Sequence, residues 1–283
     1  MSGSRMHATN RIRVALAAAP LVLAGCAKGN SPSTAEPSAG AGAENEQALQ
    51  AQLAKYCPAV VELETAAAGL DQAESEEEAR AYYNEEMKPV LQEIQANAPD
   101  EIRETLDGLV ASIEKLLAGG EVSAAEEQRA DEAEDRLHAH DLEHCGWNRV
   151  DVTGSDYAFA GIPPTVPAGT ASIEIENKGA EVHEMVVFKK KAGVTDSLDS
   201  LLAIEEQEEA AAKIEPVGYL GGVHPGDQEF LLADLTAGDY AVVCFYPVGT
   251  TPEKFAAEEA EPGQLGDDAH FTKGMRAEFR VTG

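Results

Sequence analysis

One stretch near the C-terminus constrains this chain more than any other. Residues 239–247 read Asp-Tyr-Ala-Val-Val-Cys-Phe-Tyr-Pro, an apolar strand pattern that ends close to Cys244. Downstream, His270 and Met275 are separated by four residues, and upstream a second apolar run, residues 182–188, carries His183. One thiol, two imidazoles and one thioether therefore occur together in a β-rich region.

This set of side chains is typical of a copper site in which one Cys and two His form a trigonal plane and Met is a weak axial ligand. Soft sulfur suits Cu(I) and imidazole suits Cu(II), so one rigid cage can serve both oxidation states. The sequence predicts one type 1 copper site with the ligands His183, Cys244, His270 and Met275. Each residue also has an ordinary alternative: a histidine at a strand end or in a loop, a core methionine, or an inert buried cysteine.

The chain around these residues has the pattern of a β-sandwich. Residues 171–176 alternate apolar and polar side chains, as a half-buried strand does, and Gly and Pro separate the candidate strands. We expect a domain over residues 149–283 that folds as an antiparallel, Greek-key sandwich. The residues 195–213 are acidic and rich in Ala, which predicts a helical insertion. The candidate strands are 171–176, 183–189, 228–233, 239–245 and 276–281.

Three segments of this domain resemble the cupredoxins, the plastocyanin-like family of small Greek-key sandwiches. Residues 177–188 are similar to the family segment that carries the first His ligand, and 237–244 to its Gly-x-Tyr-x-x-x-Cys strand. His270 and Met275, before a final strand, match the family's second His and axial Met. The resemblance covers about residues 150–283 and implies blue-copper chemistry at these positions.

Two features depart from the family pattern. A typical cupredoxin has only a few residues between the Cys and the second His, whereas residues 245–269 separate them here and predict an exposed insertion. Glu184 stands where family members often have an Asn that ties the two ligand loops together. An ionised carboxylate cannot donate that hydrogen bond, so we expect weaker support around the ligands. Val223-His-Pro225 is an alternative source of the second imidazole.

Residues 46–148 have a different composition, rich in Ala, Glu and Leu and nearly without β-branched runs. Apolar residues recur at helical spacing over about 46–69, 76–97 and 99–118, and more weakly over about 122–143. Pro58 is expected to interrupt the first helix and Pro89 to kink the second. Four such helices with short connections predict an antiparallel bundle, so that the whole chain is an α+β multidomain protein.

The remaining cysteines and histidines of this region suggest two further features. Cys57 and Cys145 flank the helical region, and in an oxidising compartment we expect them to form a disulfide that closes the bundle. His138, His140 and His144 cluster near its end, and the last two are one helical turn apart. That spacing can chelate a metal, but an exposed polar helix face beside Asp141 and Glu143 is the simpler interpretation.

The N-terminus has the pattern of an export signal rather than of a folded element. Three Arg residues precede a short apolar run and the string Leu-Ala-Gly-Cys, which ends at Cys26 and resembles a bacterial lipobox. We expect residues 1–25 to be a lipoprotein signal peptide and Cys26 to carry lipid such as palmitate. Residues 26–45 then form a flexible tether, and the protein is held on the extracytoplasmic face of the cell membrane.

Charge and motifs exclude several classes of function. The chain carries 51 acidic and 21 basic residues, a net charge of −30, so nucleic acid is not an expected partner. It contains no motif of a serine hydrolase, zinc protease, P-loop or dinucleotide-binding enzyme, and we do not expect an enzyme.

The sequence therefore predicts a membrane-anchored lipoprotein that binds copper for electron transfer or copper handling at the cell surface. A redox or metal-handling protein is the implied partner. The alternative is a non-redox envelope lipoprotein, with a structural or binding role, whose sandwich lacks metal.

Overall fold

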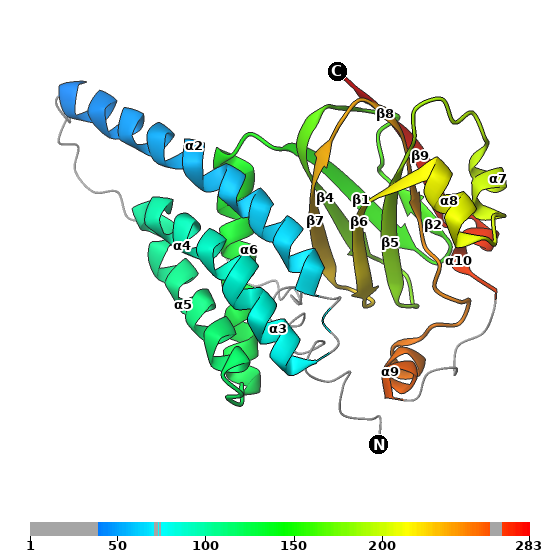
Figure 1. Cartoon of the computed structure of the whole chain (residues 1–283), viewed down its shortest axis with the longest axis horizontal. Helices are drawn as coiled ribbons and strands as arrows, with labels where there is room; N and C mark the ends of the chain where they lie inside the picture. The colour runs from blue at the N-terminus through cyan, green and yellow to red at the C-terminus, as the bar shows by residue number, and fades with distance from the viewer. Residues whose placement is uncertain (1–38, 71–72, 74, 261–267) are drawn as a thin grey trace, which may run out of the picture. The chain divides into compact units, whose positions relative to one another are not determined.

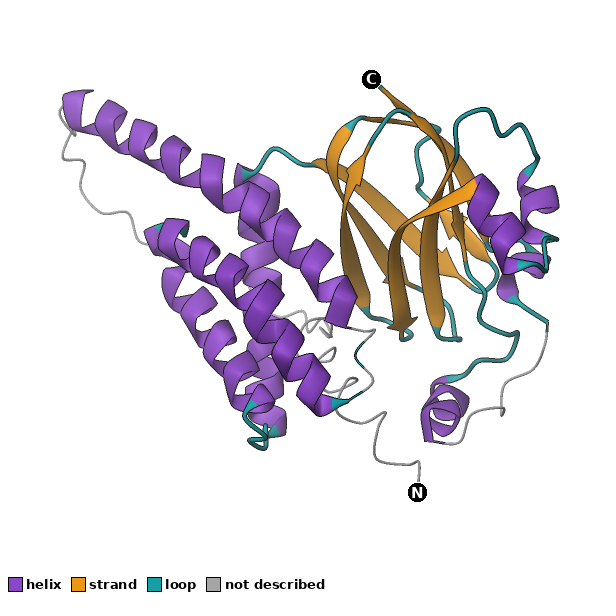
Figure 2. Cartoon of the chain, viewed as in Figure 1, coloured by secondary structure: helices purple, strands orange, loops and turns teal. Residues whose placement is uncertain are grey.

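The chain divides into two compact units, with the boundary between Gly146 and Trp147. A computed structural model describes residues 39–70, 73, 75–260 and 268–283 (Figures 1 and 2). The predicted signal peptide and Cys26 lie outside these residues. The first unit is helical and the second is built mainly from strands, each with its own buried core.

The first helix among the described residues of the N-terminal unit is longer and more continuous than the sequence predicts. Helix α2 spans Ala39–Leu70, so the predicted tether was wrong for residues 39–45, which are helical. Pro58 lies inside α2 and does not interrupt it. A proline in a helix interior costs about 3 kcal/mol. Here burial of the neighbouring Tyr56, Cys57 and Ala59 against the rest of the unit offsets that cost.

The predicted second helix is divided at its proline. It consists of α3 (Glu76–Tyr82), a π-helical turn η1 (Tyr83–Met87) and α4 (Lys88–Asn97). The backbone N–H of Lys88 donates to the carbonyl of Tyr83, five residues back, instead of four. Pro89 has no N–H to donate, and the wider turn accommodates it without ending the helix.

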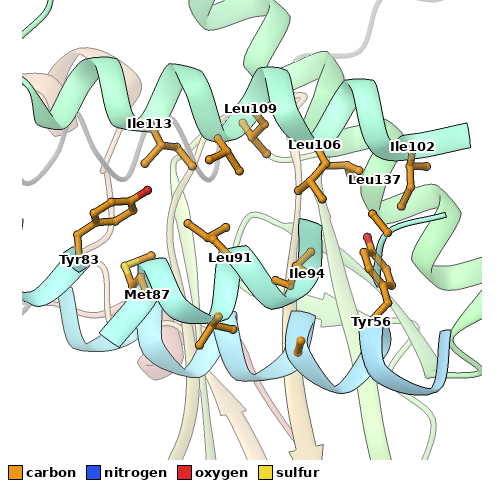
Figure 3. Packing of buried hydrophobic residues seen from close by; sticks show 14 of the residues in the cluster. Tyr56, Tyr83, Met87, Leu91, Ile94, Ile102, Leu106, Leu109, Ile113 and Leu137 are labelled. Carbon is orange, nitrogen blue, oxygen red and sulfur yellow. The ribbon is translucent and has the colours of Figure 1, made fainter. Parts of the chain in front are cut away.

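Two further helices follow in the described part of the unit, α5 (Asp100–Leu117) and α6 (Ala124–His144). A capping box begins α6, in which Ser123 and Glu126 satisfy each other's backbone N–H groups. Short connections link α4 to α5 and α5 to α6, and these helices reverse direction along the chain (Figure 1). Their apolar faces meet in one buried cluster, where Ile94, Leu106 and Ile113 are nearly inaccessible to solvent (Figure 3).

The predicted disulfide is confirmed. Cys57 of α2 is bonded to Cys145, which directly follows α6, and their Cα atoms are 5.5 Å apart. The bond therefore joins α2 to the residue that follows α6. Cys244 of the second unit is free and buried.

The second unit is a sandwich of two sheets. One sheet has the strand order β2-β1-β4-β7 and the other β3-β9-β8-β5-β6. Apolar residues from both sheets, including Ile173 and Val242, share one buried cluster, as the two inner faces of a sandwich do. The strands are β1 (Asn148–Ser155), β2 (Ala158–Ala160), β3 (Thr165–Pro167), β4 (Gly169–Asn177), β5 (His183–Lys190), β6 (Ile214–Val223), β7 (Gln228–Leu235), β8 (Gly238–Val243) and β9 (Arg276–Thr282).

The sheets are mixed and not purely antiparallel, which corrects the sequence-based prediction. Strand β1 pairs in parallel with β4, and β3 pairs in parallel with β9. The chain leaves the first sheet after β2, passes through β3 in the second and returns as β4. Because the chain crosses to the second sheet and back, β4 can pair with β1 in the same direction. Two strands joined by a short hairpin can pair only in opposite directions.

In the described parts of the connections between strands there are four short helices. Helices α7 (Leu198–Leu202) and α8 (Gln207–Lys213) occupy the predicted helical insertion between β5 and β6. Helix α9 (Pro252–Ala260) lies within the insertion after Cys244, and α10 (His270–Lys273) follows it. Nowhere in the described part of the chain is a helix both long enough and apolar enough to cross a membrane.

Removal of the disulfide should destabilise the helical unit. Cys57 and Cys145 are separated by 88 residues in the sequence, and crosslinking so long a loop restricts the unfolded chain. We expect the double variant Cys57→Ala/Cys145→Ala to lose about 4 kcal/mol of unfolding free energy. Urea unfolding followed by far-UV circular dichroism measures this loss. Cys244→Ser keeps the disulfide and is the control; an equal helical transition in both variants would contradict the prediction.

Candidate metal centre

Strand register brings three of the predicted ligands to one end of the second sheet. Strand β8 lies between β5 and β9, and Val243 pairs with Val186 on one side and Arg276 on the other. Cys244 is the next residue after β8, Met275 immediately precedes β9, and His183 begins β5. The N–H of Cys244 donates to the carbonyl of Met275 at 3.1 Å, which fixes these two residues side by side.

The fourth predicted ligand, His270, completes a compact donor set. Its Nδ1 lies 3.3 Å from Sγ of Cys244 and 3.2 Å from Nδ1 of His183. The three ligand atoms all lie within 4.8 Å of one another. His183, Cys244, His270 and Met275 each have 0% of their surface exposed. Two ring nitrogens and one sulfur therefore converge in a site closed to solvent, with the buried Met275 beside them in the chain.

The long insertion returns to the site because its two ends are hydrogen-bonded together. The N–H of His270 donates to the carbonyl of Tyr246 at 2.8 Å, and that of Phe271 donates to the carbonyl of Cys244 at 3.0 Å. Pro247 and Ala269 form a β-bridge. The position of His270 is thus set by backbone pairing next to Cys244, whatever the length of chain between them.

His224, the alternative source of the second imidazole, is not part of this group. Its ring packs edge-on against Phe255 of α9, with the ring centroids 5.6 Å apart. The predicted His270, and not His224, supplies the imidazole that faces Cys244 and His183.

A residue that the sequence interpretation did not single out, Glu181, organises the surroundings of His270. Its Oε2 accepts a hydrogen bond from the N–H of Thr250 at 3.0 Å and lies 2.9 Å from Nε2 of His270. The same oxygen accepts from the N–H of Gly249, and Oε1 accepts from the hydroxyl of Tyr157 at 2.8 Å. A proton on Nε2 of His270 leaves the Nδ1 lone pair directed at the thiol, as a metal-ligating histidine requires.

Glu184 supports the site in a different way from the expected Asn. Its carboxylate accepts a hydrogen bond from the N–H of Phe245 at 2.7 Å, and its own N–H points to Sγ of Cys244 at 3.5 Å. The expectation of weak support at this position was therefore wrong. The backbone N–H of Phe245 is the donor in this hydrogen bond, so the carboxylate of Glu184, as the acceptor, joins the two ligand segments. A side-chain donor at residue 184 is not needed.

Buried backbone contacts also hold the loop that carries Glu181 and His183. The amide of Asn177 is fully buried and donates to the carbonyls of Glu181 and Val223, both at 2.8 Å. Gly179 leaves room for the imidazole of His183, since a Cβ built there would lie 2.8 Å from Nε2. The imidazole of His183 can therefore occupy this place because residue 179 has no side chain.

Burial shifts the protonation of the donors in the metal-free site. Burial lowers the pKa of His183 to about 4, so the ring is neutral and has a lone pair available. Burial raises the pKa of the Cys244 thiol to about 12. A bound cation must therefore displace the thiol proton, as is general for Cys ligands. Burial opposes ionisation of Glu181, but hydrogen bonds from Tyr157 and His270 hold its pKa below the usual value.

The residues fit one type 1 copper site. The donor set is two imidazoles and one thiolate, which is the trigonal set of such sites, and Met275 supplies the thioether. The buried Nε2 of His183 has no hydrogen-bond partner among the described residues, although Oδ1 of Asp156 lies 3.8 Å from it.

Comparison with known proteins gives structural neighbours only. No protein-family model matches the sequence, and no curated protein matches it. Reduced auracyanin from Roseiflexus castenholzii is 18% identical over 48% of this chain and 98% of its own, with a TM-score of 0.31. Auracyanin A, a "blue" copper protein from Chloroflexus aurantiacus, is 15% identical over 47% and 98%, with a TM-score of 0.24. Reduced rusticyanin is 17% identical over 47% and 77%, with a TM-score of 0.26. At such scores, the assignment of copper rests on the site residues.

Loss of the Glu181 carboxylate should weaken copper binding. Glu181→Gln replaces an anionic acceptor by an amide that cannot accept from His270 and the loop N–H groups with the same strength. We expect copper affinity to fall by about 10–100-fold, the usual effect of removing an outer partner of a ligand. A competition titration with a chromophoric chelator measures it. Glu176→Gln is the control, because the carboxylate of Glu176 forms a surface ion pair with Lys178. Unchanged affinity in Glu181→Gln would show that His270 is positioned without it.

Proposed function

We propose that this chain is a cupredoxin-like electron-transfer protein that binds one copper ion in its second unit. The observation that carries the proposal is the convergence of His183, Cys244 and His270, all fully buried, beside Met275. Bound copper would supply one-electron chemistry by cycling between Cu(I) and Cu(II). The task of the protein is to hold the donors in nearly the same place in both states.

The closed character of the site favours electron transfer over copper handling. None of the four side chains exposes any surface, and backbone hydrogen bonds fix the segments that carry Cys244 and His270. A protein that delivers copper must open its site to release the ion. An electron can leave a closed site, whereas an ion cannot, so a rigid buried cage suits the first role better. The same closure leaves no open position for a substrate, which supports a non-enzymatic role.

Two aromatic side chains mark where a redox partner would approach. Phe245 directly follows Cys244 and is 42% exposed, and its ring packs edge-on against Phe271, which follows His270. Both ligand segments thus place a phenyl ring next to the ligand in the chain, and the ring of Phe245 is exposed while that of Phe271 is partly buried. A partner protein with an apolar contact face would bring its own redox centre close to the thiolate through this pair.

The proposal includes anchoring at the membrane through Cys26. Its support is the lipobox-like string after a basic and apolar leader, and the disulfide between Cys57 and Cys145 is consistent with export to an oxidising compartment. A lipid on Cys26 would keep the copper unit on the extracytoplasmic face, near other envelope redox proteins.

The ligand set predicts distinct spectroscopic effects for each substitution. Wild-type protein loaded with Cu(II) should show an intense visible band from thiolate-to-copper charge transfer, and Cys244→Ser should abolish it. His183→Ala and His270→Ala should each lose high-affinity Cu(II). Met275→Leu should keep the colour but raise the reduction potential, because a weaker axial donor stabilises Cu(II) less. Absorption spectra and redox titrations measure these effects.

His224→Ala is the matched control for the histidine substitutions, since His224 lies in the same unit outside the donor set. It should leave both band and affinity unchanged. Wild-type protein that develops no such band and retains no copper after dialysis would contradict the proposed copper function. A chain that begins at residue 27 is suitable for these measurements, since it keeps every described residue.

The anchor is tested by a separate substitution. Cys26→Ala should release the protein from the membrane fraction or leave its signal uncleaved, because no lipid can then be attached. Fractionation of expressing cells and the mass of the product report the two outcomes. Normal processing together with unchanged membrane retention would contradict anchoring at this residue.

A further inference from the structure

A second group of side chains of the types that can bind a metal lies in the helical unit. Glu101 of α5 and His140 and His144 of α6 place one ligand atom each within 4.8 Å of one another. Oε1 of Glu101 is 3.2 Å from Nε2 of His140 and 3.8 Å from Nε2 of His144. The two rings are one helical turn apart, with centroids separated by 4.5 Å. Both Nε2 atoms therefore face the same carboxylate.

The packing of α5 on α6 fixes this arrangement. Ile102, next to Glu101, and Leu137, one turn before the histidines, belong to the same buried cluster (Figure 3). The guanidinium of Arg136 donates to the backbone carbonyl of Glu101 at 3.3 Å. Cys145 directly follows His144, and its disulfide ties this end of α6 to α2. The backbone of the group is thus held by core packing and a covalent bond.

One ring nitrogen in the group is buried and faces the carboxylate of Glu101. His140 is 9% exposed, and its Nε2 is buried without a hydrogen-bond partner among the described residues, although Glu101 lies at ion-pair distance. Its other nitrogen, Nδ1, is 3.1 Å from Oδ1 of Asp141, which is itself buried. Asp141 was expected on an exposed face, and its burial corrects that expectation. A carboxylate on the ring nitrogen that does not bind the ion is the usual setting of a metal-ligating imidazole, and here the other nitrogen, Nε2, faces the carboxylate of Glu101.

We propose that Glu101, His140 and His144 bind a divalent transition-metal ion such as Zn²⁺. Two imidazoles and one carboxylate are a known three-residue set for this ion. Ligands at about 2.1 Å from a tetrahedral metal are about 3.4 Å apart, close to the separations of Glu101 from the two rings. The carboxylate also offsets the charge of the ion, and Asp141 fixes the tautomer of His140 that directs a lone pair at it.

This second site differs in character from the copper centre. It has no sulfur ligand, and the Glu101 side chain is 59% exposed, so solvent can complete the coordination and the ion can exchange. Nitrogen and oxygen ligands favour a borderline divalent ion, whereas the buried thiolate set also suits Cu(I). The inference does not depend on copper in the second unit, because the two sites share no residue.

The experiment uses a chain that begins at residue 27 and carries Cys244→Ser, which removes the thiolate of the other site. Zn²⁺ is titrated in competition with a chromophoric chelator, after prior removal of metal. Glu101→Gln/His144→Ala is compared with this parent, and both changed side chains are partly exposed, so the fold should persist. Far-UV circular dichroism verifies that it does. Glu143→Gln is the matched control, since Glu143 is an exposed acid on the same helix outside the group.

We expect the double variant to lose one equivalent of bound Zn²⁺, or to bind it more than about 100-fold more weakly, since loss of an outer partner alone weakens binding 10–100-fold. Glu143→Gln should bind as the parent does. Equal stoichiometry and affinity in the parent and the double variant would overturn the proposal. An equal loss in Glu143→Gln would also overturn it, because binding would then reflect only the acidity of the helix.

Discussion

The candidate copper centre depends on the backbone hydrogen bonds that join the segment after β8 to the segment before β9. The pairs from Cys244 to Met275, from His270 to Tyr246 and from Phe271 to Cys244 continue the sheet past its last regular residues. Without them, residues 245–269 would separate the two halves of the donor set. Closure entropy grows only slowly with loop length, so this local pairing is sufficient to bring His270 back to the thiol.

Two glutamate carboxylates join the segments of this site through hydrogen bonds. Glu181 receives hydrogen bonds from Tyr157 and from two N–H groups of the insertion, and it faces His270. Glu184 receives the N–H of Phe245. Each joins the segment around His183 to the segment after Cys244. The groups that face these two carboxylates are all hydrogen-bond donors. Acceptors are therefore needed at both positions, Glu181 in the loop before β5 and Glu184 at the start of β5.

The sequence was informative where a residue's role depends on its own strand and less so where it depends on a distant partner. The apolar runs that carry His183 and Cys244, the short spacing from His270 to Met275 and the resemblance to the cupredoxins together predicted the four candidate ligands. Glu181 was missed, although it lies two residues before His183, because its partners are distant in the sequence. The same reason hid Glu101, which is far from His140 along the chain. Pro58 misled the helix prediction because tertiary packing outweighed a local penalty.

The two candidate centres show how one acidic chain can separate two kinds of metal chemistry. A net charge of −30 attracts cations of every kind without distinguishing among them. Selection must therefore come from donor type and access. The copper centre buries sulfur and imidazole completely, which excludes strongly hydrated ions that cannot shed their water for soft ligands. The helical group offers imidazole and an exposed carboxylate, which a borderline divalent ion can bind while it keeps a solvent ligand. A rigid closed cage suits an ion that stays while electrons move, and an open three-residue site suits an ion that comes and goes.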